Sequence, residues 1–169
     1  EVKVDRLGRI IQDTGTGGSW PCSSDRVVWA LSAWNIYLAT GDMDWLQKAY
    51  DIIGRSLEAD FVVVYNPQTG LFRGESSFID WREQSYPVWA QPADIYMSEC
   101  LGTNAAYYGV LKVMEDMATV LGKKKDVKKY GQKAEALKKA INDNFWVEED
   151  GYYASYLYGR QNLTRTQQS

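Results

Sequence analysis

Four glycines divide this chain into two units with the same internal spacing. Gly41 and Gly122 each lie between two stretches of helical periodicity, and Gly70 and Gly151 each precede an extended stretch that carries aromatic residues. The members of each pair are 81 residues apart. Side-chain identity between the units is low, so they share a geometry rather than a sequence motif. Repeated helical hairpins whose alternate connections gather at one end form either a solenoid or a closed α/α toroid.

Apolar residues that recur at three- and four-residue steps predict two helices in each unit, joined by turns short enough to make them antiparallel. The chain is therefore expected to be mainly α-helical, with short strands in its connecting loops near 71–72 and 152–158. The predicted segments are an N-terminal loop at 1–22, hairpins at 25–64 and 97–145, a loop at 70–96 and a tail at 159–169. The first helix, 25–40, should bury one apolar stripe: Val27, Ala30, Leu31, Trp34, Tyr37 and Leu38.

Composition narrows the possible functions. The 169 residues carry a net charge of −3, which argues against a nucleic-acid partner, and no stretch is apolar enough to span a membrane. Histidine is absent, which excludes Ser-His-Asp and Cys-His catalysis and removes the commonest metal ligand, so we predict no metal or cofactor. Cys22 and Cys100 either form a disulfide in an oxidising compartment or are buried thiols. Because the chain begins at Glu1, we expect a processed product or a piece of a longer protein, and we favour a periplasmic or secreted location.

The connection between the two hairpins is rich in groups that perform chemistry. The stretch 70–86, GLFRGESSFIDWREQSY, has no helical period. Carboxylates, guanidinium groups and an indole on one loop are typical of a sugar-binding site, and apolar or cationic neighbours shift carboxyl pKa values in opposite directions. The alternative is a polar loop with internal salt bridges. Its chemical groups are Glu75, Asp80, Glu83, Arg73, Arg82, Phe78 and Trp81.

The first hairpin and this loop resemble parts of the six-hairpin, (α/α)6-barrel glycosidases, and the resemblance covers about 20–158. Glu75-Ser76-Ser77-Phe78-Ile79-Asp80 resembles the loop that carries the general acid in several of those families. Trehalases of this type have Glu-Ser-Gly-aromatic-Asp there, and debranching enzymes have Thr-Trp-Met-Asp. The present element is one residue longer than the trehalase type and has Ser77 where that type has glycine. The hairpin residues that carry the resemblance are Asp25, Arg26, Trp29, Trp34, Tyr37, Thr40, Gly41, Asp42, Trp45 and Leu46.

The resemblance implies glycoside hydrolysis by paired carboxyl groups, in the inverting arrangement that leaves room for a water. It assigns the general acid to Asp80, whose apolar neighbours Phe78, Ile79 and Trp81 would help to keep it protonated. The alternative is that Asp80 pairs with Arg82 or caps the next turn. Glu75 is the competing acid.

Further residues are candidates for contact with a carbohydrate substrate. Asp25 and Arg26 would hold sugar hydroxyls, or else form a helix cap with its salt-bridge partner. Glu99 either faces the site or stabilises the start of a helix. The remaining candidates are the stacking platforms Trp20, Trp81 and Trp89 and the polar residues Arg82 and Glu83.

Two hairpins are present where a closed barrel needs six, and nothing after Tyr158 offers a catalytic base. We therefore expect a fragment of a larger glycosidase that is inactive alone and self-associates through exposed apolar helix faces. Two alternatives stay open. One is a polysaccharide lyase on the same toroid, using Tyr86 and Arg82, and the other is a non-catalytic helical-repeat module that binds carbohydrate or protein.

Overall fold

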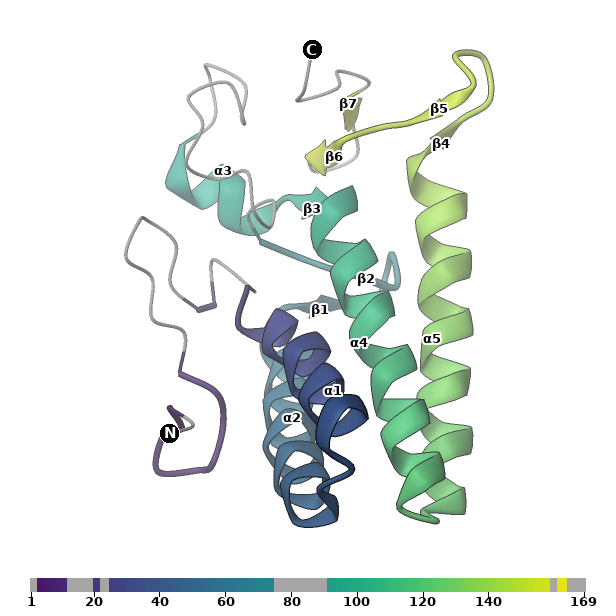
Figure 1. The fold of residues 1–169 in the computed structure, drawn as a ribbon. Coiled ribbons are helices and arrows are strands. Elements are labelled where there is room, and N and C mark those ends of the chain that lie inside the picture. Colours follow the sequence, from purple (N-terminus) through teal and green to yellow (C-terminus); the bar gives the residue numbers. More distant parts are fainter. Residues whose placement is uncertain (1–2, 12–19, 22–24, 75–90, 159–160, 164–169) are drawn as a thin grey trace.

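Two helical hairpins form the body of the structure, a computed structural model that describes residues 3–11, 20–21, 25–74, 91–158 and 161–163 (Figure 1). A 3-10 turn, η1 (Asp25–Val28), leads into α1 (Trp29–Thr40), which pairs with α2 (Met43–Val63). The second hairpin consists of α4 (Leu101–Val120) and α5 (Lys124–Phe145). Gly41 and Gly122 adopt φ values of 67° and 69° at the turns, where residues with a Cβ are strained.

Each hairpin ends in a two-stranded antiparallel sheet. In the first unit β1 (Tyr65–Asn66) pairs with β2 (Leu71–Phe72), and in the second β4 (Trp146–Val147) pairs with β5 (Tyr152–Tyr153). The first residues of α2 and α5, of β1 and β4, and of β2 and β5 are all 81 residues apart, as the glycines are. The predicted repeat therefore holds for the second helix and the two strands of each unit, whereas α1 and α4, the first helices, begin 72 residues apart.

The upper end of Figure 1 gathers the connections that follow the first unit. A short helix, α3 (Pro92–Met97), precedes β3 (Glu99–Cys100), which forms a sheet of order β3-β6-β7 with β6 (Tyr156–Tyr158) and β7 (Gln161–Leu163). Two predictions are corrected here. The third long helix begins at Leu101 rather than at 97, and the tail contributes a paired strand.

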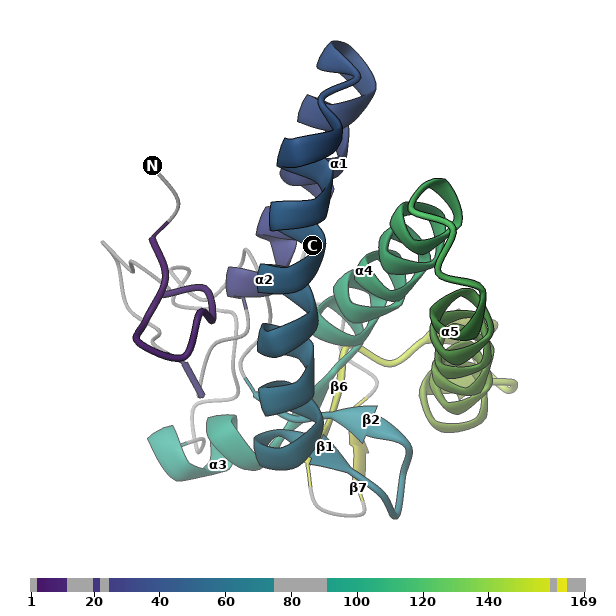
Figure 2. The same cartoon turned by 90° about the horizontal axis from the view of Figure 1, so that it is seen from below.

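Helix α4 lies at the centre of the packing, beside α1, α2 and α5 (Figure 2). Its buried residues, including Leu111, Met114 and Met117, pack with Ile53 and Leu57 of α2. No helix in the described ranges combines the length and apolar composition needed to cross a membrane.

The predicted stripe of α1 is only partly correct. Val27 and Ala30 are buried as predicted, whereas Leu31 is 37% exposed and Leu38 is 60% exposed. Helix α1 instead buries the side that carries Ala30 and Ala33, because α2 and α4 pack there. The first helix therefore presents apolar side chains to solvent.

Gly70 offers a test of the turn that closes the first unit. Its φ is 77°, and a Cβ there would lie 3.1 Å from the Cβ of Ala140. Gly151 has a φ of 68° with no atom within 4 Å of such a Cβ. Gly70→Ala is expected to lower the free energy of unfolding by about 1–2 kcal/mol. The loss should exceed that of Gly151→Ala, because both variants strain the backbone but only the Cβ added at Gly70 contacts a neighbour, Ala140. Urea denaturation measures both, and equal losses would show that the Ala140 contact has no effect.

Candidate active site

A buried ion pair lies at the point where the first hairpin meets the N-terminal segment. Arg26 of η1 is 6% exposed and pairs with Asp60 of α2, which is fully buried. The Trp20 indole donates to the Asp60 carboxylate at 2.8 Å, and the Arg26 guanidinium lies 4.2 Å from the centre of the Trp20 ring. Burial raises the pKa of the Asp60 carboxyl, and the Arg26 guanidinium opposes that shift. This cluster fixes the entrance to α1.

A second polar group joins the two hairpins. Glu99 of β3 is 5% exposed, and its Oε1 accepts hydrogen bonds from Asn66 Nδ2 and Thr69 Oγ1, both at 2.7 Å. Asn66 ends β1 and Thr69 lies in the turn between β1 and β2, so Glu99 connects the end of the first unit to the start of α4. Glu99 therefore has internal partners at the end of the molecule where α4 begins.

The loop expected to carry the general acid is attached at that same end. Gly74 donates to the Ser98 carbonyl at 2.9 Å and its own carbonyl oxygen lies 3.2 Å from Cys100 Sγ. Beyond the loop, Gln91 is the N-cap of α3, and its backbone N–H donates to Asp94 Oδ2 at 2.8 Å. The residue before 75–90 is therefore held by hydrogen bonds close to the N-terminus of α4, and the residue after it by a hydrogen bond within the first turn of α3.

The predicted site residues fall into two groups. Arg26, Trp20 and Glu99 are described, and each has the internal partners given above. The backbone of Asp25 begins η1. The other predicted site residues lie outside the described residues, so their roles stay predictions: they are Glu75, Asp80, Trp81, Arg82, Glu83 and Trp89. A Cys22–Cys100 disulfide also stays a prediction, because Cys22 lies outside the described residues. Within the described ranges, no group of three or more Cys, Asp or Glu side chains is arranged to hold a metal ion.

Sequence analysis missed two buried polar residues, Asp60 and Asn104. Asp60 lies three residues after Leu57 on the apolar stripe of α2, and a carboxylate in such a stripe signals a buried partner. Asn104 lies on the buried face of α4, and its side chain clamps the backbone of Phe72. Neither signal identifies the partner, which comes from another element.

Comparison with known proteins places this arrangement in a family. The family model of the bacterial alpha-L-rhamnosidase 6 hairpin glycosidase domain matches residues 13–167. The chain belongs to this family. The predicted six-hairpin glycosidase superfamily is thereby confirmed, through the rhamnosidase branch, which the sequence analysis did not name. This family is a family of glycosidase domains, as the resemblance implied.

The fold is also found among solved structures. The chain is similar to a rhamnosidase from Klebsiella oxytoca with rhamnose bound, with a TM-score of 0.60 and 15% sequence identity. The match covers 90% of this chain and 28% of that one, so the chain spans less than a third of the length of the rhamnosidase. None of the curated proteins compared with the chain matches it.

Proposed function

We propose that this chain is the acid-carrying part of a glycoside hydrolase that cleaves α-L-rhamnosides. The observation that carries the proposal is the family match, which spans 13–167 and so includes the whole of the predicted site loop, 70–96. The rhamnose bound to the similar Klebsiella oxytoca protein supports the choice of sugar. The match to 28% of that protein supports the view that the chain works within a longer one.

In this proposal Asp80 is the general acid and donates its proton to the glycosidic oxygen as the bond to the anomeric carbon breaks. A carboxylate from a hairpin outside the present chain accepts a proton from a water that attacks the opposite face of the sugar. The two carboxyl groups of such inverting enzymes are about 6.5–9.5 Å apart, which leaves room for the water. Glu75 is the alternative acid on the same loop.

The described residues would support this chemistry by positioning. The hydrogen bond of Gly74 to Ser98 holds the start of the loop close to the N-terminus of α4, and that of Gln91 fixes the first turn of α3 after the loop. The Arg26–Asp60 pair and Glu99 fix the elements on either side. The proposed contacts to the sugar then come from Asp25 and from the loop residues Trp81, Arg82, Glu83 and Trp89.

The test is hydrolysis of a panel of aryl glycosides, including an α-L-rhamnoside, by the full-length protein that contains this chain. Asp80→Asn is expected to lower kcat at least a hundredfold, because general acid catalysis contributes about 10²–10⁴-fold. Asp143→Asn, a change on the exposed face of α5, is the control and should leave kcat unchanged. Proton NMR of the first product anomer tests inversion.

Several outcomes would contradict the proposal. Unchanged activity in Asp80→Asn would remove the acid role from that residue, and loss in Glu75→Gln would transfer it. An unsaturated product that absorbs in the ultraviolet would indicate a lyase instead. Binding of sugar without turnover, unaffected by Asp80→Asn, would indicate a binding module.

The chain alone should be inactive and should self-associate. Ile36 and Leu38 of α1 are 46% and 60% exposed, and neither is covered by the described part of the chain. In the longer protein, we propose, further hairpins cover part of this apolar surface. Sedimentation of the isolated chain over a range of concentrations checks the association.

A further inference from the structure

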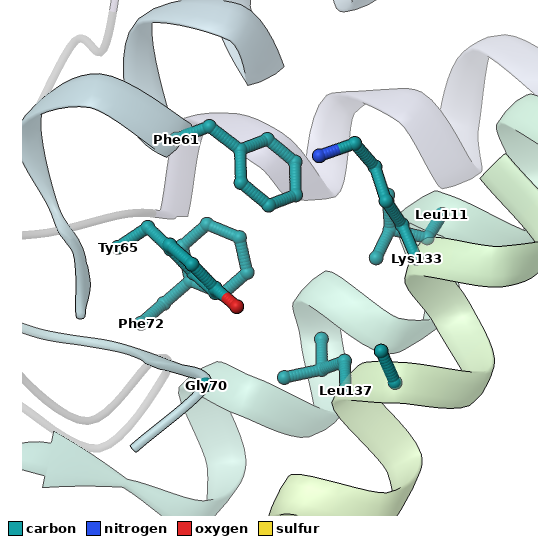
Figure 3. Close-up of a pocket in the computed structure, with 8 residues that line it drawn as sticks. Phe61, Tyr65, Gly70, Phe72, Leu111, Lys133 and Leu137 are labelled. Carbon is teal, nitrogen blue, oxygen red and sulfur yellow. The ribbon is translucent and has the colours of Figure 1, made fainter. Parts of the chain in front are cut away.

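Two neighbouring cavities lie between α2 and α5, and Gly70 and Phe72 at the start of the predicted site loop line the smaller one. The smaller has a volume of about 80 Å³ and is lined by Phe61, Tyr65, Phe72, Leu137 and Lys133, among others (Figure 3). The larger, of about 240 Å³, is lined by apolar side chains of α2 and by Lys129 and Lys133 of α5. Phe61 and Lys133 line both cavities, so the two spaces meet at this pair.

Lys133 has an unusual environment for an ammonium group. Its Nζ lies 3.4 Å from the centre of the Phe61 ring, and it forms no ion pair within the described part of the chain. Burial, and to a smaller extent the charge of Lys129, lowers the pKa of Lys133. The face of an aromatic ring attracts a cation. It does not replace the hydrogen bonds that the three ammonium N–H groups would donate to a carboxylate. Among the described residues, the Lys133 ammonium is therefore partly buried without a counter-ion.

A second polar group faces the same space. Figure 3 shows the Tyr65 hydroxyl pointing into the smaller cavity from an aromatic cluster with Phe61 and Phe72. The ring centres of this cluster are 5.0–5.2 Å apart. The Tyr65 hydroxyl makes no hydrogen bond with any described residue. The Tyr65 hydroxyl and the Lys133 ammonium line the same cavity from different elements, β1 and α5, and a hydroxyl donor and an ammonium are groups that recognise a carboxylate.

We propose that these cavities bind a small organic acid, with its carboxylate at Lys133 and Tyr65 and its apolar chain in the larger cavity. Charge and polarity together select this ligand. Lys129 and Lys133 make the mouth cationic, and Glu58, the one carboxylate that lines it, lies 3.8 Å from Lys129 and is mostly exposed. Leu57, Val62 and Tyr130 offer an apolar surface for a short alkyl chain.

The probe is sodium hexanoate, titrated by calorimetry into the full-length protein, with the uncharged hexanamide as the matched ligand control. Hexanoate should bind with a Kd of about 1 mM, as expected for a ligand of this size, and hexanamide at least tenfold more weakly. Lys133→Met should weaken hexanoate binding at least tenfold and Tyr65→Phe about threefold. Lys138→Met, on the exposed side of α5, should have no effect.

Equal affinity for hexanoate and hexanamide would overturn the proposal without relying on any variant. Unchanged binding in Lys133→Met, or no binding of hexanoate at 20 times the expected Kd (about 20 mM), would also overturn it. A dimer that dissociates in Lys133→Met would instead place a carboxylate of a second copy in the cavity. None of these measurements depends on glycosidase activity, so the result is independent of the proposed function.

Discussion

Replacing Asp60 with asparagine is expected to lower the free energy of unfolding by about 3–5 kcal/mol, because it leaves the Arg26 guanidinium buried without a counter-charge. Arg26 is 6% exposed and Asp60 is fully buried, so water cannot replace the lost carboxylate. The Trp20 indole N–H would also donate to a neutral amide oxygen in place of a carboxylate, which makes a weaker hydrogen bond. Urea denaturation followed by circular dichroism measures the loss. Asp143→Asn, which breaks the exposed pair with Lys139, is the control and should leave the midpoint unchanged.

Removing the other partner should make stability depend on pH in a specific direction. Burial already raises the pKa of Asp60, and Arg26 opposes that rise. In Arg26→Met the pKa of Asp60 rises further, so the folded state keeps a proton that the unfolded chain releases above about pH 4. The variant should therefore be most stable at low pH and lose stability as pH rises above about 4, over a wider range of pH than the wild type does. A flat profile would show that Asp60 is solvated in the variant.

The double variant Arg26→Met/Asp60→Leu separates charge from packing. A buried ion pair can often be replaced by apolar residues of similar volume with little loss. We therefore expect the double variant to recover much of the stability lost by either single variant. If it is as unstable as Asp60→Asn, the hydrogen bonds to Trp20 and to the Ser56 carbonyl account for the effect instead.

The helical units could be predicted from the sequence because their signals are local. Gly41 and Gly122 adopt left-handed backbone at the turns, and the stripe of α2 has the period of a helix with one buried face. Prolines at 87 and 92 predict an irregular or barely helical stretch, and the structure has the short helix α3 there because Pro92 occupies the first helical position, where proline is favoured. Its start is fixed by the hydrogen bond between Gln91 and Asp94.

The polar contacts of the site region could not be predicted because their partners are far apart in the sequence. Arg26 and Asp60 are separated by 34 residues, and Asn66 and Glu99 by 33. The exposure of Leu31 and Leu38 has a related cause, since periodicity reports that a helix has an apolar face but not which neighbours cover it. The resemblance to glycosidases named a loop, and its residues 75–90 lie outside the described part of the chain.

Replacing Asn104 with alanine should also lower the free energy of unfolding by about 3–5 kcal/mol. Asn104 is fully buried in α4, and its Oδ1 accepts from the Phe72 N–H at 2.7 Å. Its Nδ2 donates to the carbonyl oxygens of Phe72 at 3.0 Å and of Cys100 at 2.9 Å. Alanine leaves the N–H and the carbonyl of Phe72 without their partner, whereas the Cys100 carbonyl at the N-cap of α4 keeps its intrahelical bond, and each unsatisfied buried group costs about 1–3 kcal/mol. Asn142→Ala removes a surface hydrogen bond from Tyr153 and is the matched control.

Asn104→Asp tests whether hydrogen bonding rather than volume causes the loss. Aspartate has nearly the same shape and still accepts from Phe72, but its second oxygen faces two carbonyl oxygens. These oxygens should raise the pKa of the new carboxyl, so the folded variant binds a proton that the unfolded chain releases, and stability falls as pH rises above about 4. Denaturation of Asn104→Asp at pH 5 and pH 8 measures this difference, and equal midpoints would contradict the clamp. Because Phe72 is two residues before Gly74, loosening this clamp should also lower glycosidase activity in the full-length protein, through the position of the loop rather than through its chemistry.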